Sequence, residues 1–240
     1  MNQRINLWSS PRNISTALMY SFANRTDCQV YDEPLYAHYL YVSGKKHPGR
    51  TEILNSQSQD GNQVVQEILL KEVPKKPVQL FKQMTHHLIQ LDLAFLTEMK
   101  NVLLIRDPAE IIFSYGKVID HIEMVDIGIA AQTELVEHLD THNVLHGIVD
   151  AKELLLHPEK VLKQLCEQID IPFEDNMLEW EPGARPEDGV WAPYWYANVH
   201  QSTGFQTYRK RAVVLNEAQT QLNQICQPIY AQLYKRAIKA

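Results

Sequence analysis

The sequence predicts a three-layer α/β fold with a central, mainly parallel sheet. Short apolar segments alternate along the chain with segments whose apolar residues recur at helical spacing. This alternation is typical of a parallel sheet, because each crossover between parallel strands runs through a helix that covers one face. With 240 residues, 45% of them hydrophobic, the chain can bury one sizeable core. We therefore expect residues 1–240 to form a single domain.

The expected strands are short and rich in Val, Ile, Leu or aromatic residues. They cover residues 4–8, 28–32, 78–82, 101–105 and 143–149. Because buried parallel strands are covered on both faces, they show such near-continuous apolar runs.

The expected helices follow from apolar residues spaced at i, i+3, i+4 and i+7. The first shows the pattern most clearly, with Ile14, Ala17, Leu18 and Phe22 on one face, and Pro158 opens a later helix at the position where proline is favoured. We expect helices over residues 14–22, 62–72, 85–99, 108–121, 126–141, 158–170 and 214–238.

Residues 181–211 lose all periodicity but are unusually aromatic. The aromatic residues of this segment include Trp191, Tyr194, Trp195, Tyr196, Phe205 and Tyr208. A long irregular segment inside a compact domain is uncommon and often covers a binding site. We interpret residues 181–211 as a covering loop before the C-terminal helix 214–238.

Charge and cysteine content exclude several classes of function. The formal net charge of −6 disfavours general attraction to nucleic acid or to an anionic membrane surface, so any anion must be held by a local site. Cys28, Cys166 and Cys226 lie far apart and fit neither a metal motif nor a disulfide framework. The chain has no membrane-spanning run and no signal-peptide pattern, so we expect a cytoplasmic protein. The sequence carries no signal for an oligomeric state.

The hydroxyl-rich loop after the first strand is the strongest candidate for a binding site. A junction between a strand and a helix gathers free backbone N–H groups at the positive end of the helix dipole, where phosphate or sulfate binds. Ser, Asn and Pro also form ordinary caps and turns, which is the alternative interpretation. The polar side chains of this loop are Ser9, Ser10, Arg12, Asn13, Ser15 and Thr16.

Polar residues also follow the next three strands. Ligands of open parallel sheets bind outside the carboxyl ends of the strands, so these side chains are expected to share one edge. They are Asp32 and Glu33 after the second strand, Lys82 with His86 and His87 after the third, and Arg106 after the fourth.

Three blocks of sequence resemble the sulfotransferases that use 3′-phosphoadenosine 5′-phosphosulfate (PAPS), in particular their bacterial sulfotransferase-like branch. Residues Ser10–Leu18 are similar to the loop for the 5′-phosphosulfate. Leu103–Pro108, followed by Ser114, is similar to the motif for the 3′-phosphate. The distal stretch Val149–Trp180 is similar to the part of the family that precedes the covering loop. The resemblance implies a P-loop NTPase-like fold, PAPS as co-substrate and 3′-phosphoadenosine 5′-phosphate (PAP) as product, with no metal.

The resemblance assigns the nucleotide to residues of the first two blocks. The guanidinium of Arg106 can donate two hydrogen bonds to the oxygens of one phosphate. Ser114 lies two turns along the helix that begins near Pro108, so Arg106 and Ser114 can face the same phosphate. The alternative is that Arg106 forms a surface salt bridge at a helix start. The expected cofactor-binding residues are Ser10, Arg12, Asn13, Ser15, Thr16, Arg106 and Ser114, with Ser202 from the covering loop.

Sulfuryl transfer needs charge neutralisation, help for the leaving phosphate and a base. Arg12 would neutralise charge and Lys82 would reach the bridging oxygen, although Lys82 is alternatively a surface lysine. Glu33 is the preferred base, with His86 or His87 as the other candidates. The acceptor would be a hydroxyl or amine of a small molecule, in a pocket lined by Tyr36, His38 and Tyr39.

The chain departs from the family pattern in the first loop. No glycine occurs before Gly44, and Ile14 is unsuited to a positive φ. One alternative is therefore a catalytically silent, sulfotransferase-like protein that binds anions or nucleotides. A P-loop kinase would need G-x-x-x-x-G-K-[ST], which is missing, and an aminotransferase with Lys82 as its pyridoxal phosphate lysine conflicts with the order of the blocks. The adjacent His86 and His87 do not have the spacing of metal ligands.

Overall fold

The computed structural model describes residues 2–71, 75–117, 121–210 and 212–240. Parts of the expected helices 62–72 and 108–121, and the last residue of the expected loop 181–211, lie outside these residues.

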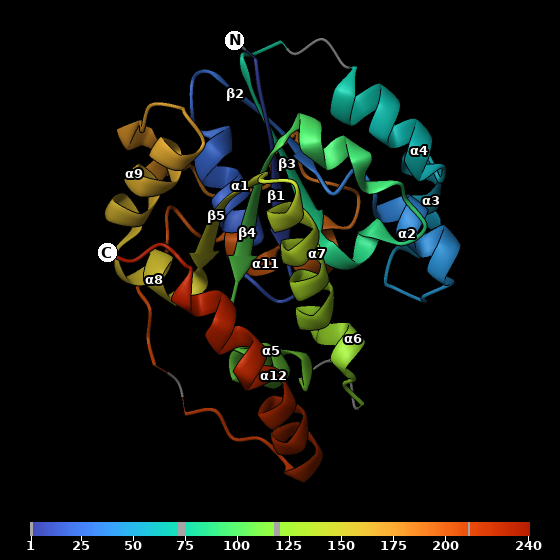
Figure 1. Ribbon diagram of the computed structural model, residues 1–240, viewed down its shortest axis with the longest axis vertical. Coiled ribbons are helices and arrows are strands. Elements are labelled where there is room, and N and C mark those ends of the chain that lie inside the picture. The colour runs from blue at the N-terminus through green and yellow to red at the C-terminus, as the bar shows by residue number, and fades with distance from the viewer. Residues whose placement is uncertain (1, 72–74, 118–120, 211) are drawn as a thin grey trace.

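One parallel sheet forms the centre of the protein. Its strands are β1 (Gln3–Ser9), β2 (Cys28–Asp32), β3 (Val78–Met84), β4 (Lys100–Ile105) and β5 (Leu145–Asp150). They are arranged in the order β2-β3-β1-β4-β5, and each neighbouring pair is parallel. The five expected strands are therefore confirmed (Figure 1).

The register of the sheet brings the ends of its three central strands together. Ser9, the last residue of β1, lies opposite Met84 of β3 on one side and Leu104 of β4 on the other. Because the strands are parallel, their carboxyl ends share one edge, and the loop after β1 leaves the sheet at the middle of this edge.

Alternating side chains of the strands build two cores, one on each face of the sheet. On one face, Ile5 and Leu7 pack with α1 (Ser15–Ala23) and α9 (Pro158–Gln168), through residues such as Leu18 and Leu162. On the other face, Trp8 packs with α7 (Ile129–Thr141) and α12 (Glu217–Lys235). This arrangement confirms the three-layer prediction (Figure 1).

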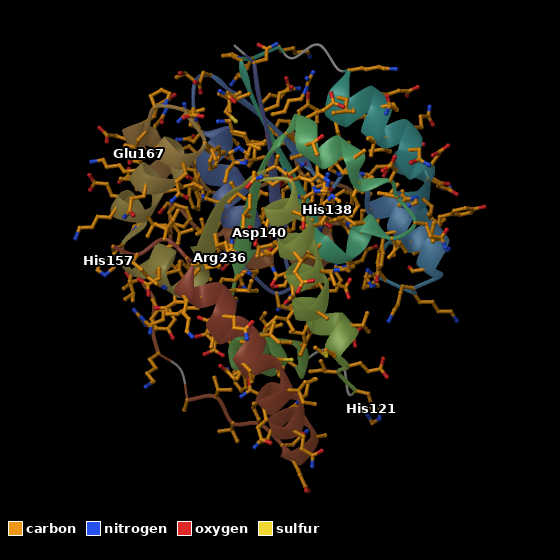
Figure 2. All side chains as sticks on the ribbon, viewed as in Figure 1. His121, His138, Asp140, His157, Glu167 and Arg236 are labelled. Atoms are coloured by element: carbon orange, nitrogen blue, oxygen red, sulfur yellow. The ribbon has the colours of Figure 1, made fainter. Side chains whose placement is uncertain are left out.

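The last helix is fixed at both of its ends. Asn216 and Gln219 form a capping box, each side chain accepting from the other's backbone N–H, so α12 starts at Glu217. Near its end, Arg236 Nη1 lies 2.6 Å from Asp140 Oδ2 of α7 (Figure 2). Beyond the helix, the Ile238 N–H donates to the Ile148 carbonyl of the edge strand β5, at 2.8 Å.

Several helix predictions were wrong in extent or continuity. Residues 85–99 form two 3₁₀ helices, η2 (Thr85–Leu88) and η3 (Leu93–Glu98), because the chain between them is extended at Ile89 and has a positive φ at Gln90. The expected helix 126–141 is broken at Gly128, whose φ of 75° separates α6 (Met124–Ile127) from α7. Within 62–72, α4 (Gly61–Val64) continues as a π-helix, η1 (Val65–Leu70).

The remaining helices are short. The second strand is followed by α2 (Tyr36–Ser43) and α3 (Arg50–Ser56), and the fourth by α5 (Pro108–Tyr115). The unpredicted α8 (Ala151–Leu156) starts directly after β5, because the Asp150 side chain accepts from the N–H groups of Lys152 and Glu153. The 3₁₀ helix η4 (Asp175–Leu178) follows α9. No helix within the described ranges is long and apolar enough to cross a membrane.

The described part of the segment 181–211 is packed rather than loose. It contains only the short helices α10 (Ala192–Trp195) and α11 (Ala197–His200), and Gly204 forms an isolated bridge with Glu179. Trp191 and Tyr196 are buried in a cluster with Tyr36 and Leu40 of α2. We call residues 181–210 the covering segment.

Candidate functional site

The loop between β1 and α1 is tied to both neighbouring strands. Thr85, directly after β3, donates from its hydroxyl to the Ser9 carbonyl at 3.2 Å. On the other side, Asn13 Nδ2 donates to the Leu104 carbonyl of β4 at 3.1 Å. The loop is therefore held at the middle of the sheet edge, between the ends of β3 and β4.

The turn in this loop is made at Arg12, without a glycine. Arg12 has a φ of 55°, in the left-handed region that costs a non-glycine residue about 1 kcal/mol, whereas Ile14 has an ordinary φ of −97°. Among the described residues no side chain caps α1. The N–H groups of its first turn are thus available to an anion, as the sequence predicts.

The residues expected at the 3′-phosphate form one network with the loop. Arg12 Nε donates to Ser114 Oγ at 3.0 Å, and Arg106 Nη1 donates to the Arg12 carbonyl at 2.8 Å. Arg106 also pairs with Glu110 at 2.8 Å, as the salt-bridge interpretation supposes. These contacts leave N–H donors of the guanidinium unused, so Arg106 retains the capacity to bind a phosphate oxygen.

The backbone at Gly128 packs against the loop, a contact that the sequence did not predict. A Cβ at this position would lie 3.5 Å from Pro11 Cδ and 3.7 Å from Ser10 Cβ. The break between α6 and α7 therefore brings backbone against the loop.

A buried cluster of charges lies at the ends of β2 and β3. Lys82 Nζ donates to Asp32 Oδ1 at 2.7 Å, to Glu33 Oε1 at 2.6 Å and to the Tyr196 hydroxyl at 2.6 Å. Lys82 is fully buried, so it is not the surface lysine of the alternative interpretation. Burial opposes its charge, but Asp32 and Glu33 outweigh burial and hold the pKa of Lys82 well above its ordinary value.

The covering segment completes this cluster. The Tyr196 hydroxyl donates to Asp32 Oδ2 at 2.7 Å, and the Gly189 N–H donates to the same oxygen at 3.1 Å. Trp191 Nε1 in turn donates to the Tyr196 hydroxyl at 3.0 Å. The sequence prediction placed Tyr196 in a covering loop but not in the site. The signal for Tyr196 in the sequence was the high aromatic content of this loop.

Glu33 differs from Asp32 in both backbone and surroundings. It has a φ of 42°, and its backbone is fixed by N–H donation to the Lys82 carbonyl at 2.8 Å. Glu33 Oε2 lies 4.0 Å from His87 Nε2, beyond hydrogen-bond distance. Burial raises the pKa of Glu33 above its ordinary value, while Lys82 opposes the shift.

His86 and His87 lie among aromatic rings next to Glu33. His87 stacks on Tyr36 and Tyr39 with ring centroids 5.0 Å and 4.8 Å apart, and His86 meets Tyr39 edge-on at 4.7 Å. Burial lowers the pKa of His86 to about 3 and that of His87 well below its ordinary value. Both imidazoles are thus neutral at neutral pH. Within the described residues, Nδ1 of each has no hydrogen-bond partner.

His38 and Ser202 make hydrogen bonds outside the loop after β1 and the buried charge cluster. His38 bonds the Ile89 carbonyl at 2.8 Å through Nε2, between α2 and the chain after η2. Ser202 accepts from Trp180 Nε1 at 3.1 Å and donates to the Val199 carbonyl at 2.7 Å. The hydrogen bonds of the described residues therefore do not join Ser202 to the loop after β1.

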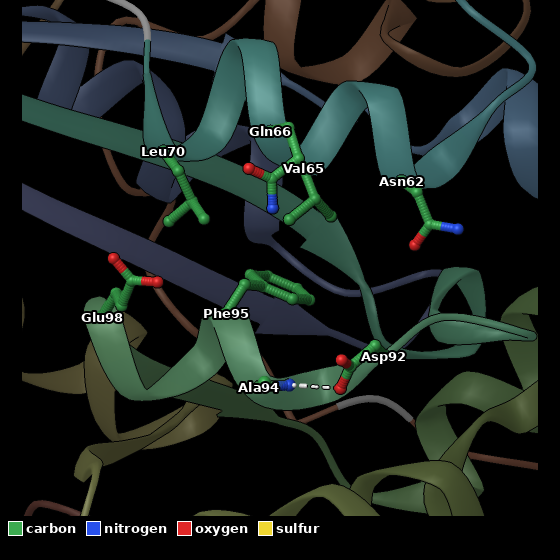
Figure 3. A pocket seen from close by; sticks show the side chains of 8 residues that line it. All are labelled: Asn62, Val65, Gln66, Leu70, Asp92, Ala94, Phe95 and Glu98. Atoms are coloured by element: carbon green, nitrogen blue, oxygen red, sulfur yellow. Dashed lines mark hydrogen bonds between the residues drawn. The ribbon is translucent and has the colours of Figure 1, made fainter.

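Two cavities lie away from this edge of the sheet. One, of about 170 Å³, is lined by residues of η1 and η3 with Asn62 and Asp92 (Figure 3). The other, of about 270 Å³, lies at the amino ends of β1 and β4 and is lined by Gln3 and Lys100 among others. In the described part of the chain, no group of three or more His, Cys, Asp or Glu side chains is arranged to hold a metal ion.

The strand order and the loop-to-helix junction after the central strand β1 define a three-layer α/β protein of the P-loop NTPase-like class. Within this class, the chain belongs to the sulfotransferase domain family, whose pattern it matches over residues 3–237.

Comparison with known proteins adds relatives and similar folds. Two proteins of Arabidopsis thaliana, branched-chain-amino-acid aminotransferase-like proteins 2 and 1, are 38% identical over 227 and 206 residues, 94% and 86% of this chain. The chain spans 40% and 37% of their lengths. The sulfotransferase domain from the curacin biosynthetic pathway has a TM-score of 0.59 at 17% identity, covering 100% of this chain and 99% of that one. A sulfotransferase from Alicyclobacillus acidocaldarius has a TM-score of 0.57 at 10% identity, covering 100% and 97%. At these identities the two structures show a shared fold.

Proposed function

We propose that the protein transfers a sulfuryl group from PAPS to a hydroxyl or amine of a small acceptor. The observation that carries this proposal is the meeting of two groups of residues at one edge of the sheet. The Arg12–Ser114–Arg106 network lies after β1 and β4, and the Lys82–Glu33 pair lies at the ends of β3 and β2. When bound, PAPS supplies the activated sulfuryl group.

The donors of the loop suit the two ends of this nucleotide. The first turn of α1, with Ser10, Asn13, Ser15, Thr16 and the Arg12 guanidinium, would hold the 5′-phosphosulfate, because helix amino ends and guanidinium groups bind such anions. Arg106 and Ser114 would hold the 3′-phosphate through the donors that their protein contacts leave unused.

Glu33 is the proposed base that takes the acceptor's proton. Its burial favours proton uptake, because the pKa of a buried carboxyl is raised toward neutral pH. The imidazole of His86, with a pKa of about 3, is a much weaker base. His86 and His87 would instead line the acceptor pocket with Tyr36 and Tyr39.

Lys82 has no donor to spare in this structure. An ammonium group has three N–H donors, and Asp32, Glu33 and Tyr196 accept from Lys82 Nζ. Its proposed contact with the leaving oxygen therefore requires one of these partners to be released. This full engagement favours a second candidate function, a sulfotransferase-like protein that binds nucleotide without transferring the sulfuryl group.

An aminotransferase function, suggested by the names of the two plant relatives, finds no support at Lys82. A lysine that forms a Schiff base must become neutral, whereas the two carboxylates hold the pKa of Lys82 well above its ordinary value. A kinase function lacks support for another reason, since no lysine occurs between Ser9 and Ala23 to contact the phosphates of a nucleotide.

Isothermal titration with PAP tests the nucleotide assignment. We expect binding at sub-millimolar PAP, with affinity at least about tenfold lower in Arg106→Ala, because a charged hydrogen-bonding group is lost. Arg236→Ala is the matched control, since Arg236 pairs with Asp140 of α7 and not with a residue of the loop (Figure 2). No binding to the wild type would overturn the proposal. A radiolabelled sulfuryl donor, screened against hydroxyl and amine acceptors, then separates transfer from binding alone.

A further inference from the structure

Asp32 and Glu33 are adjacent carboxylates with unequal sets of hydrogen-bond donors. Asp32 receives Lys82 on Oδ1, and the Tyr196 hydroxyl and Gly189 N–H on Oδ2. Glu33 receives Lys82 on Oε1, and in the described part of the chain no donor hydrogen-bonds to Oε2. Because hydrogen bonds favour the charged form of a carboxyl group, Asp32 is the better stabilised anion.

The donors that distinguish Asp32 come from the covering segment. Asp188 anchors this segment to α1, since it accepts from the Tyr20 hydroxyl at 2.7 Å. Within the segment, Asp188 pairs with His200 Nε2 at 2.9 Å. This anchor holds the next residue, Gly189, against Asp32. The Tyr196 hydroxyl, which is buried, then links Asp32 and Lys82 directly.

We propose that Tyr196 is a positioning residue, which keeps Asp32 ionised and bound to Lys82 so that Glu33, and not Asp32, accepts the acceptor's proton. This inference rests on the proposed transfer function and adds the covering segment to the proton-transfer machinery. The contacts of the covering segment thereby set which carboxylate of the pair is the base.

The titratable groups around Glu33 come from every neighbouring element. They are Asp32 of β2, Lys82 of β3, Tyr36 of α2, His87 of η2, Tyr115 of α5 and Tyr196 of the covering segment. Burial and the nearby Asp32 raise the pKa of Tyr196 well above its ordinary value, so its hydroxyl keeps its proton and remains a donor. The pKa of His87 is well below its ordinary value, so its ring stays neutral while the carboxyl pair titrates.

Removal of the Tyr196 hydroxyl tests the proposal. In Tyr196→Phe, Asp32 Oδ2 loses one of its two donors, so a proton entering the pair is shared with Asp32. The acid limb of kcat/KM then moves to higher pH, because the pair as a whole holds its proton more tightly. Tyr194→Phe is the matched control, since the half-exposed Tyr194 lies in the same segment but outside the cluster.

The midpoints are measured by an NMR titration of protein labelled with ¹³C at the Asp and Glu carboxyl groups. Asp32→Asn and Glu33→Gln assign the carboxyl signals of the two residues. We expect Glu33 to take the first proton of the pair in the wild type and in Tyr194→Phe. Should Tyr196→Phe fail to fold, Trp191→Phe serves instead, because it removes the indole donor to the Tyr196 oxygen and weakens the same contact.

The titration requires neither sulfuryl donor nor acceptor, so its result is independent of transfer. An Asp32 midpoint that is the same in the wild type and in Tyr196→Phe overturns the positioning role. A different outcome separates the two proposals. If the Asp32 midpoint is raised in Tyr196→Phe while the wild type binds PAP but transfers no sulfuryl group, the link between Tyr196 and Asp32 is supported and only the proposed transfer function is overturned.

Discussion

Arg12 Nε lies 3.0 Å from Ser114 Oγ, although 102 positions separate the two residues in the chain. This contact joins the loop after β1 to the helix after β4. The residues expected at opposite ends of the nucleotide are therefore linked directly, and a change at either residue is expected to affect both ends.

Ser114→Ala is expected to lower the affinity for PAP by about tenfold or more. The variant removes both a proposed phosphate contact and the acceptor that orients the Arg12 guanidinium, and hydrogen bonds to charged groups contribute about 1.5–3 kcal/mol. Isothermal titration measures the loss. Ser56→Ala, at an exposed position of α3, is the matched control. Equal affinity in Ser114→Ala and in the control would contradict the role of Ser114.

Two substitutions at Arg12 separate backbone strain from ligand binding. Arg12→Gly and Arg12→Ala both remove the guanidinium, so both are expected to weaken PAP binding to a similar extent. Because a φ of 55° is unfavourable for alanine but not for glycine, Arg12→Gly is expected to be more stable than Arg12→Ala by about 1 kcal/mol. Urea unfolding and PAP titration of both variants check this, and equal stabilities would show that the loop relaxes at Arg12.

Lys82→Met is expected to lower the free energy of unfolding by about 3–5 kcal/mol near neutral pH. The variant leaves Asp32 and Glu33 buried without their cation, whose methylene stem is replaced by an apolar chain of similar length. The folded-state pKa of the carboxyl pair then lies above its unfolded value. The folded state is thus favoured at low pH, and this stability is lost as the pH rises through the folded pKa.

Urea unfolding of Lys82→Met at a series of pH values checks the sign of this effect. The deficit relative to the wild type should shrink as the pH falls toward the ordinary carboxyl range of about 4. Lys163→Met, which removes an exposed pair with Glu159, is the control and should leave the stability almost unchanged at every pH. A deficit in Lys82→Met that does not change with pH would mean that lost packing, rather than unpaired charge, destabilises the variant.

The pH dependence of transfer distinguishes Glu33 from His86. Glu33 must be ionised to accept a proton, and burial raises its pKa, so transfer should increase with pH through a value above the ordinary one for glutamate. His86, with a pKa of about 3, has completed its titration at lower pH. His86→Gln should therefore keep the position of this acid limb, whereas Glu33→Gln should lose transfer. The opposite result would assign the base to His86.

The fold was predictable because the sheet is encoded locally. Each strand is a short apolar run, and the register that joins Ser9 to Met84 and Leu104 follows from ordinary parallel pairing. The prediction failed where distant contacts decide the backbone. Residues 85–99 have the composition of a helix, but the chain leaves helical geometry at Ile89, whose carbonyl bonds His38 of α2.

The site was predictable in part for the same reason. Glu33, Lys82 and Arg106 could be proposed from the sequence because each lies at or near a strand end, where parallel sheets bind ligands. The contact between Tyr196 and Asp32 could not be predicted, because Tyr196 lies 164 positions away and no spacing rule connects the two residues. The turn at Arg12 was missed as well, since arginine has no special preference for positive φ.

The hydrogen bond from Ile238 to Ile148 bears on how copies of the protein meet one another. Strand β5 is an edge of the sheet, and exposed edge strands offer unpaired backbone groups that recruit strands from other molecules. By occupying the Ile148 carbonyl, Ile238, three residues beyond α12, leaves that position of the edge strand closed to pairing with another strand. The residues that follow α12 thus cover part of the open edge of the sheet as well as anchoring the last helix.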